Sequence, residues 1–164
     1  MKQKILRTLT KLSLILALVS LSLVSASAQA TKKILVVTVT KGFRHSSIPT
    51  AESVLAKLAE KSGAFTVDYV RNDEDMKTKM TAEALKNYDG FVFANTTGIL
   101  PLPDKEAFLN AIKGGKAFVG MHSASDTFHG KNNQIDPYIL MLGGEFRTHK
   151  EQACIECLVQ DAKH

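Results

Sequence analysis

Short apolar runs, each followed by a polar loop, recur along residues 32–164. The runs at 33–39, 90–94 and 116–121 are nearly continuous in Ile, Val, Leu, Phe, Ala and Met, as expected for strands buried on both faces. Residues 65–70 alternate between apolar and polar side chains, which predicts a strand with one more exposed face. A similar run at 153–159 predicts a fifth strand.

Helical patterns fill the intervals between these strands. Residues 51–59 carry apolar side chains at helical spacing, behind Pro49 in the first turn and before Gly63 at the end. Shorter helices are predicted at residues 82–86 behind a Thr81 cap, 103–112 and 135–142. Crossover connections between parallel strands are right-handed, so this alternation predicts an α/β fold: an open parallel sheet with helices on both faces.

The first thirty residues have the pattern of an export signal. Basic residues precede an apolar stretch at 14–24, and Ala28-Gln29-Ala30 fits an A-x-A cleavage site. The stretch is shorter than the roughly 20 residues that span a bilayer. We therefore predict a secretory signal peptide over 1–30, an exported product that is periplasmic or secreted, and no membrane span after cleavage. Residues 31–164 are then one α/β domain.

Charge and cysteine content narrow the range of possible partners and redox roles. The chain has a formal net charge of +5, but residues 1–30 hold four basic residues and no acid, so the remainder is nearly neutral. Nucleic-acid binders usually show a basic face, so we predict no nucleic-acid partner. Cys154 and Cys157 lie three apart on a predicted strand and face opposite sides, which predicts free thiols. The sequence carries no signal of oligomeric state.

Polar side chains gather where the predicted strands end, at 38–47, 93–98 and 118–126. In a parallel α/β sheet, such loops build the ligand crevice. His122 follows its strand within Gly120-Met121-His122-Ser123-Ala124, the arrangement of a nucleophile elbow. Cysteine is absent there, which excludes a thiol nucleophile of the glutamine-amidotransferase type. His122 is predicted to be a general acid or base, a hydrogen-bond donor or a metal ligand; the alternative is a histidine that only shapes the loop.

Neighbouring loop residues complete the predicted site. Asp126 lies four residues after His122 and is predicted to orient its imidazole. Arg44 suits an anionic group, and Asn95 with Thr97 offers the donors and acceptors that sugar hydroxyls require. The same residue types also form ordinary turns, and Ser46-Ser47 also suits a plain helix cap. Three further histidines lie on or near these loops: His45, His129 and His149. Histidines with a carboxylate can bind zinc, so a zinc cofactor is an alternative. No two of the histidines have the close spacing of a metal-binding motif.

At these motifs the chain resembles the ThuA-like (trehalose utilisation) family, a branch of the class I glutamine-amidotransferase-like fold. The matching segments are 41–46, 95–102, 115–127 and 141–149. The resemblance implies a flavodoxin-like sheet with histidine at the elbow, and a role in disaccharide catabolism through 3-keto sugars. It implies site positions at His45, Asn95, Thr97, His122, Ser123, Asp126 and His149. Family domains run on beyond the end of this chain, so we expect a domain incomplete at its C-terminus.

Three functions are open at this point. The first is a hydrolase or lyase acting on a glycoside or its keto derivative, with His122 as general acid/base; the loops lack the convincing acid pair of an ordinary glycosidase. The second is a carbohydrate-binding or accessory domain without catalysis, for which Phe43 and Phe128 are the main loop aromatics. The third is a metal-dependent hydrolase using His45, His122 and His149.

Overall fold

Four parallel strands form the sheet in the computed structural model of the chain, which describes residues 30–132, 134–151 and 153–163. Their order across the sheet is β2-β1-β3-β4, which confirms the predicted parallel α/β architecture. The strands are β1 (Lys32–Val37), β2 (Phe65–Val70), β3 (Gly90–Ala94) and β4 (Ala117–Met121). Residues 1–29 of the predicted signal peptide lie outside the described residues, and Lys32–His164 form one compact unit.

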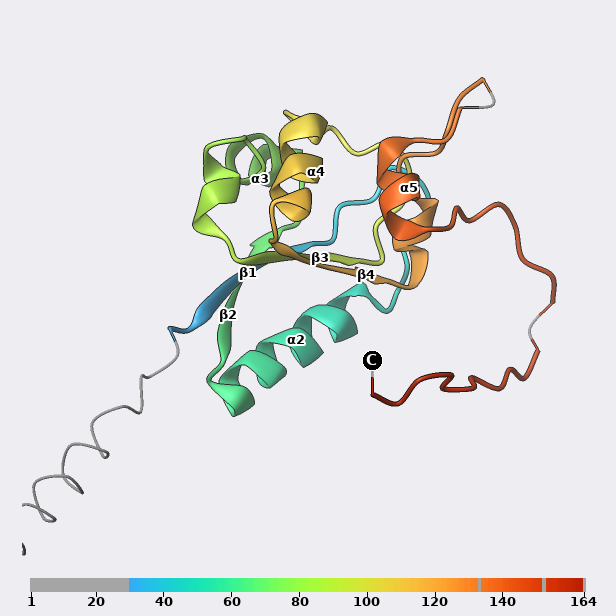
Figure 1. Cartoon of the computed structure of the whole chain (residues 1–164), viewed down its shortest axis with the longest axis horizontal. Coiled ribbons are helices and arrows are strands. Elements are labelled where there is room, and N and C mark those ends of the chain that lie inside the picture. Colours follow the sequence, from blue (N-terminus) through green and yellow to red (C-terminus); the bar gives the residue numbers. More distant parts are fainter. Residues whose placement is uncertain (1–29, 133, 152, 164) are drawn as a thin grey trace, which may run out of the picture. The chain divides into compact units, whose positions relative to one another are not determined.

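Helices cover both faces of this sheet, as the alternating pattern predicts. Helix α2 (Ile48–Ser62) lies on one face, and the other helices lie on the opposite face (Figure 1): α3 (Asp73–Lys79), α4 (Lys105–Lys113) and α5 (Pro137–Leu142). Two 3-10 helices complete the domain: η1 (Ala84–Asn87) and η2 (His122–Asp126). Among the described residues, no helix is both long and apolar enough to cross a membrane.

The alternation of side chains along β1 and β3 divides the core in two. On the α2 face, Val36 and Val92 pack with Leu55 of the helix. The opposite face is larger and aromatic: Phe93 stacks on Phe108 of α4 at 5.2 Å and on Tyr138 of α5 at 5.7 Å between ring centroids. These contacts fix α4 and α5 against the sheet, and α5 lies near the end of β4.

Local sequence signals set the helix ends. Pro49 lies in the first turn of α2, and Gly63 ends the helix with a φ of 62° while its N–H donates to Ala59 O. The Asp104 carboxylate accepts from Ala107 N at 2.8 Å and begins α4. Ser47 occupies the cap position of α2, but its side chain makes no capping bond.

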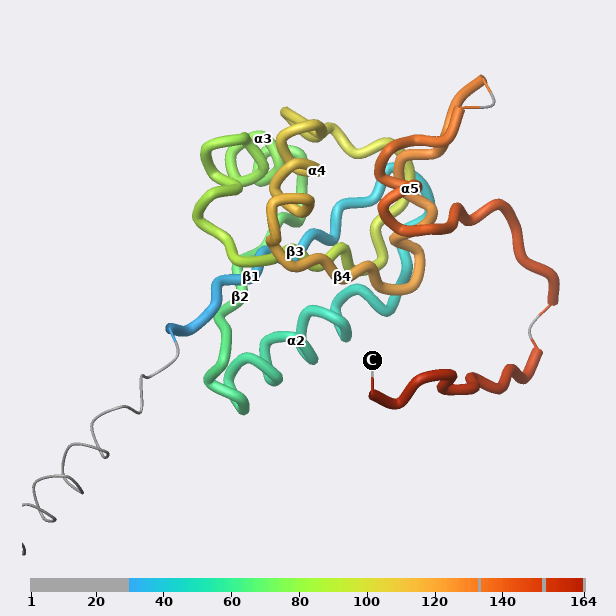
Figure 2. The backbone as a smooth tube through the Cα atoms, viewed as in Figure 1, coloured from blue at the N-terminus to red at the C-terminus, as the bar shows by residue number. Residues whose placement is uncertain are grey.

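The predicted strand at 153–159 is wrong. The described part of this segment has no helix or strand, and the chain after α5 continues as an irregular trace (Figure 2). Ile155 and Val159 are 84% and 79% exposed. A strand requires a neighbour for its backbone hydrogen bonds, and an apolar run alone does not provide one. Cys154 and Cys157 are exposed free thiols.

The predicted helix at 82–86 is displaced, and one helix was not predicted. Thr81 Oγ1 accepts from Ala84 N at 3.1 Å, but it precedes the short η1 rather than an α-helix. Helix α3 has only Met76 buried, so it shows little hydrophobic periodicity. Its signals are the Asn72 cap, which accepts from Asp75 N, and acids in its first turn.

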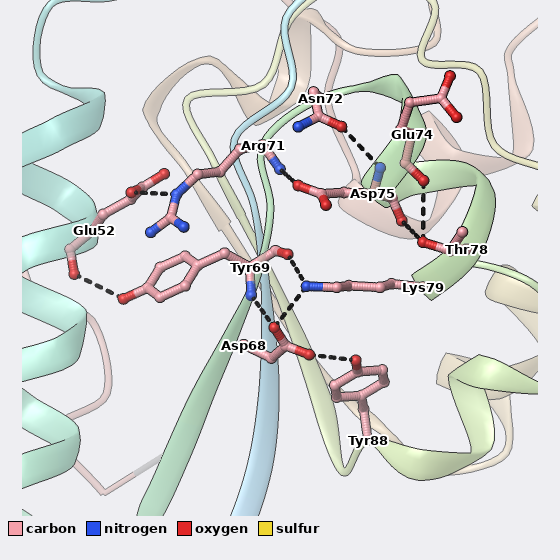
Figure 3. Close-up of polar contacts among 10 residues, drawn as sticks. All are labelled: Glu52, Asp68, Tyr69, Arg71, Asn72, Glu74, Asp75, Thr78, Lys79 and Tyr88. Atoms are coloured by element: carbon pink, nitrogen blue, oxygen red, sulfur yellow. Dashed lines mark hydrogen bonds and ion pairs between the residues drawn. The ribbon is translucent and has the colours of Figure 1, made fainter.

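A polar network ties β2 to the elements that follow it (Figure 3). The Asp68 carboxylate accepts from Lys79 Nζ of α3 at 2.8 Å and from Tyr88 Oη at 2.8 Å. Lys79 also donates to Tyr69 O. Burial alone would raise the pKa of Asp68, but these hydrogen bonds, with that from Tyr69 N, lower it to about 2.

Candidate functional site

His122 is the first residue after β4, where the chain turns into η2. Its φ is 50°, in the left-handed region that residues with a side chain rarely adopt. The turn is tight because a Cβ at Gly120 would lie 3.2 Å from the Cβ of Ala124. The strand–turn–helix order predicted for this segment is therefore present, and the imidazole is exposed at the carboxyl edge of the sheet.

The partner of His122 is His45, from the loop between β1 and α2. His122 Nε2 lies 3.3 Å from His45 Nδ1, and the two rings meet edge to face with centroids 4.3 Å apart. Phe43 packs edge-on against the other side of His45 at 4.8 Å. One ring nitrogen of the pair must donate and the other accept, so the pair can hold a shared proton and pass it between rings.

The predicted pairing of Asp126 with His122 is not the one the structure shows. Asp126 Oδ1 accepts from His129 Nε2 at 2.6 Å. Because η2 is a 3-10 helix rather than an α-helix, residues three apart lie on one side and residues four apart do not. The Asp126 carboxylate instead bonds His129, which lies beyond the end of η2, and His122 pairs with His45.

Three of the predicted binding residues brace the loops and do not line the crevice. Arg44 Nη1 donates to Thr38 O at 3.0 Å. Asn95 is 4% exposed, has a φ of 58° and donates from Nδ2 to Ser47 Oγ at 2.7 Å. Thr97 is fully buried and donates from Oγ1 to Phe43 O at 2.9 Å. Their bonds hold the 38–47 loop against the end of β3, and thereby place His45 beside His122.

Ser123 and His149 lie at the crevice wall with His122. The Ser123 hydroxyl oxygen is buried and has no hydrogen-bond partner among the described residues. His149 is exposed, donates from Nδ1 to Lys150 O at 2.8 Å, and packs near Phe146. Ser123 is therefore the polar side chain of the site with an unmet hydrogen bond.

Two crevices open on His122. The larger, of about 800 Å³, is bounded by the histidines and by the segment after α5; its walls include Phe43, His45, Ser123, Asp126, Phe146 and His149. The smaller, of about 420 Å³, lies between β4 and the 142–146 loop. Both share His122, Ser125 and Phe146. Drug-sized ligands occupy pockets of about 300–1,000 Å³, so the larger crevice has room for a small sugar.

Phe128 is not one of the crevice aromatics. It is 3% exposed and packs edge-on against Tyr138 with centroids 5.3 Å apart. The aromatic at the crevice that sequence reasoning missed is Phe146, 37% exposed. Its sequence signal is Gly143-Gly144-Glu145-Phe146, a glycine-rich turn that presents the next side chains at the end of α5. The sequence pattern also did not predict the contact between His129 Nδ1 and Glu145 Oε1, which are 3.0 Å apart.

A metal-dependent hydrolase would need several ligating side chains directed at one point. Within residues 30–132, 134–151 and 153–163, no group of three or more His, Cys, Asp or Glu side chains is placed to hold a metal ion. His45 and His122 lie within 3.3 Å of each other through their ring nitrogens, so they face one another rather than a common point.

These features define an open parallel α/β domain of the flavodoxin-like type, with a histidine elbow at the carboxyl edge of its sheet. The family model described as ThuA, trehalose utilisation, matches residues 33–164. The chain belongs to this family, and the family relates it to carbohydrate utilisation. Neither the search of curated proteins nor that of solved structures found a match.

Proposed function

We propose that the chain acts on a disaccharide or its 3-keto derivative in the crevice at the carboxyl edge of the sheet. The observation that carries this proposal is the contact between His122 and His45 at 3.3 Å, exposed to the larger crevice. A pair of imidazoles is suited to accepting and returning a proton near neutral pH. The sugar class comes from the family, which concerns trehalose utilisation.

The chemistry that suits this pair is an elimination from a 3-keto glycoside. The ketone acidifies the hydrogen on the adjacent carbon C2, and a neutral His122 removes it as a proton. The C–H electron pair then forms a C1–C2 double bond, and the C1–O bond to the second sugar breaks. The departing oxygen takes back a proton from the histidine pair, which returns to its starting state. This step requires a positioned base that can return the proton, and it does not require a pair of carboxylates.

Binding contacts follow from the side chains that face the crevice. Phe43 is 70% exposed and offers an apolar surface for a sugar ring. His149 is exposed at the crevice wall and is a polar group for sugar oxygens. Asn95, Thr97 and Arg44 contribute indirectly, by fixing the loop that carries His45.

The test uses the full chain and trehalose, sucrose and their 3-keto derivatives. A ligand at about a hundred times its Kd stabilises the fold by about 2.7 kcal/mol, so thermal melting detects binding, and product analysis detects turnover. We expect the keto sugars to bind and be cleaved, and His122→Ala to abolish cleavage while keeping most of the affinity. Lys57→Ala on α2 is the control. Binding without cleavage in either protein would identify a carbohydrate-binding module instead.

We also propose that the protein is exported, because residues 1–30 have the order of charges, apolar stretch and A-x-A site of a signal peptide. N-terminal sequencing of the protein from expressing bacteria should begin at Thr31, in a periplasmic or culture-medium fraction. A mature protein that retains Met1 would contradict export.

A further inference from the structure

A line of charged groups lies beside the two crevices. His129 Nε2 is 2.6 Å from Asp126 Oδ1, and His129 Nδ1 is 3.0 Å from Glu145 Oε1. Arg147 Nη2 lies 2.6 Å from the second oxygen of Glu145. His129 is thus held between two carboxylates, one at the end of η2 and one in the loop after α5.

Elementary chemistry determines which atoms donate and which accept in these contacts. Ionised carboxylate oxygens only accept hydrogen bonds, so each ring nitrogen of His129 must donate for both contacts to form. Glu145 is suited to this role: the hydrogen bond from Gly130 N, with the nearby Arg147 and His129, holds its pKa below the ordinary value.

The bonds of His129 join two segments that border the crevices. Phe146, next to Glu145, donates its backbone N–H to Ser125 O, next to Asp126, at 3.0 Å. Ser125 and Phe146 are shared by the walls of both crevices. The backbone bond and the ionic bonds therefore lie side by side, and they hold together the strip that separates the two spaces around His122.

We propose that His129 is a positioning residue: by bonding Asp126 and Glu145 together, it holds the 143–147 loop against η2 and fixes the wall between the two crevices. The further consequence, that loss of His129 weakens sugar binding, rests on the proposed function.

Other charged side chains line a cavity together with His129. A third cavity contains His129 together with Lys105, Lys131 and Asp136 in its walls. Lys105 is paired with Asp136 at 2.6 Å. Among the hydrogen bonds and ion pairs of the described residues, the side-chain partners of the His129 imidazole are Asp126 and Glu145. His129 therefore holds the 143–147 loop against η2 through these two carboxylates.

Hydrogen exchange at the Phe146 amide tests the positioning role without any ligand. In His129→Phe the ring can donate to neither carboxylate, and we expect that amide to exchange about tenfold faster while β1 and β3 amides are unchanged. His129→Arg, whose guanidinium donates to both carboxylates, should restore protection. The control is Lys77→Gln, which removes an exposed ion pair on α3 and should have no effect at Phe146.

Unchanged exchange at Phe146 in His129→Phe would overturn the proposal, and so would failure of His129→Arg to restore protection. If His129→Phe does not fold, Glu145→Ala removes the same link and should accelerate the same amide. Sugar titrations then separate the two proposals. Faster exchange with no sugar binding by the unmodified chain would reject only the proposed function, whereas tight binding with unchanged exchange would reject only the role of His129.

Discussion

The backbone of His122 is held at a φ of 50° because the end of β4 must turn at once into η2. For a residue with a Cβ, this left-handed conformation costs about 1–2 kcal/mol. Such strain persists only where the surroundings enforce it, and it often coincides with functional positions. At the scale of single residues, the site therefore keeps a side chain where a glycine would fit more easily.

Replacing His122 by glycine measures that strain. Glycine relieves the steric cost. Its greater freedom in the unfolded chain, however, lowers the free energy of unfolding by about 0.5–1 kcal/mol. We expect His122→Gly to be more stable than His149→Gly by about 1 kcal/mol in urea unfolding, since His149 is not among the described residues with a positive φ. Equal destabilisation by both substitutions would mean that His122 is unstrained.

Residue types alone identified the loops of the site but not the direction of each side chain. Asn95 and Thr97 lie where predicted, yet their bonds to Ser47 and Phe43 direct them into the loop. The spacing of His122 and Asp126 suggested a pair, but the 3-10 geometry of η2 does not bring them together, and Asp126 bonds His129 beyond the end of η2. The contact of His45 with His122 joins residues 77 positions apart, which no local pattern reveals.

At the scale of elements, α5 supports the elbow through a buried hydrogen bond. Tyr138 is fully buried against Phe93 and Phe128, and its hydroxyl donates to Ala124 O in η2 at 3.0 Å. Burial raises the pKa of Tyr138, so the hydroxyl keeps its proton. The elbow is thus anchored from the aromatic core beneath it.

Tyr138→Phe isolates this bond because it removes only the hydroxyl. Leaving the Ala124 carbonyl buried without its partner should cost about 1–2 kcal/mol in urea unfolding. Tyr69→Phe is the matched control, since Tyr69 Oη donates to Glu52 O over a longer 3.3 Å contact at a less buried position. Equal effects of the two substitutions would contradict a special role for the Tyr138 bond.

Asp68 links β2, α3 and the residue after η1, and it makes stability depend on pH. Its folded-state pKa of about 2 lies below the ordinary value of 3.8, so the folded state favours the ionised form. The resulting stabilisation is present above about pH 4–5 and is lost as the pH falls toward 2. Because the side chain is about one-third exposed, we expect a contribution of about 1 kcal/mol.

Asp68→Asn should therefore be less stable than the unmodified chain near neutral pH, and the difference should shrink as the pH falls toward 2. Urea unfolding at a series of pH values measures it. Glu60→Gln, at an exposed position on α2, is the control and should give no such convergence. A difference that stays constant with pH would show that the Asp68 bonds do not depend on its charge.

At the scale of the whole molecule, periodicity predicted the parallel sheet because each strand is a short apolar run flanked by loops. It missed α3, whose charged sequence is stabilised by its cap and first-turn acids. It overpredicted a strand at 153–159, because pattern cannot show whether an edge is there to pair with. Where side chains meet across the fold, as at His45 and His122 or at His129 and Glu145, only the tertiary arrangement gives the answer.

The central claim is that a sugar binds where His45 and His122 meet. The most direct measurement is an NMR titration of the full chain with a 3-keto disaccharide, following the imidazole signals of its histidines. The account predicts saturable changes at His45 and His122, with a melting temperature that rises over the same concentrations. Unchanged signals from both rings at concentrations that saturate binding would place the sugar elsewhere and contradict the claim.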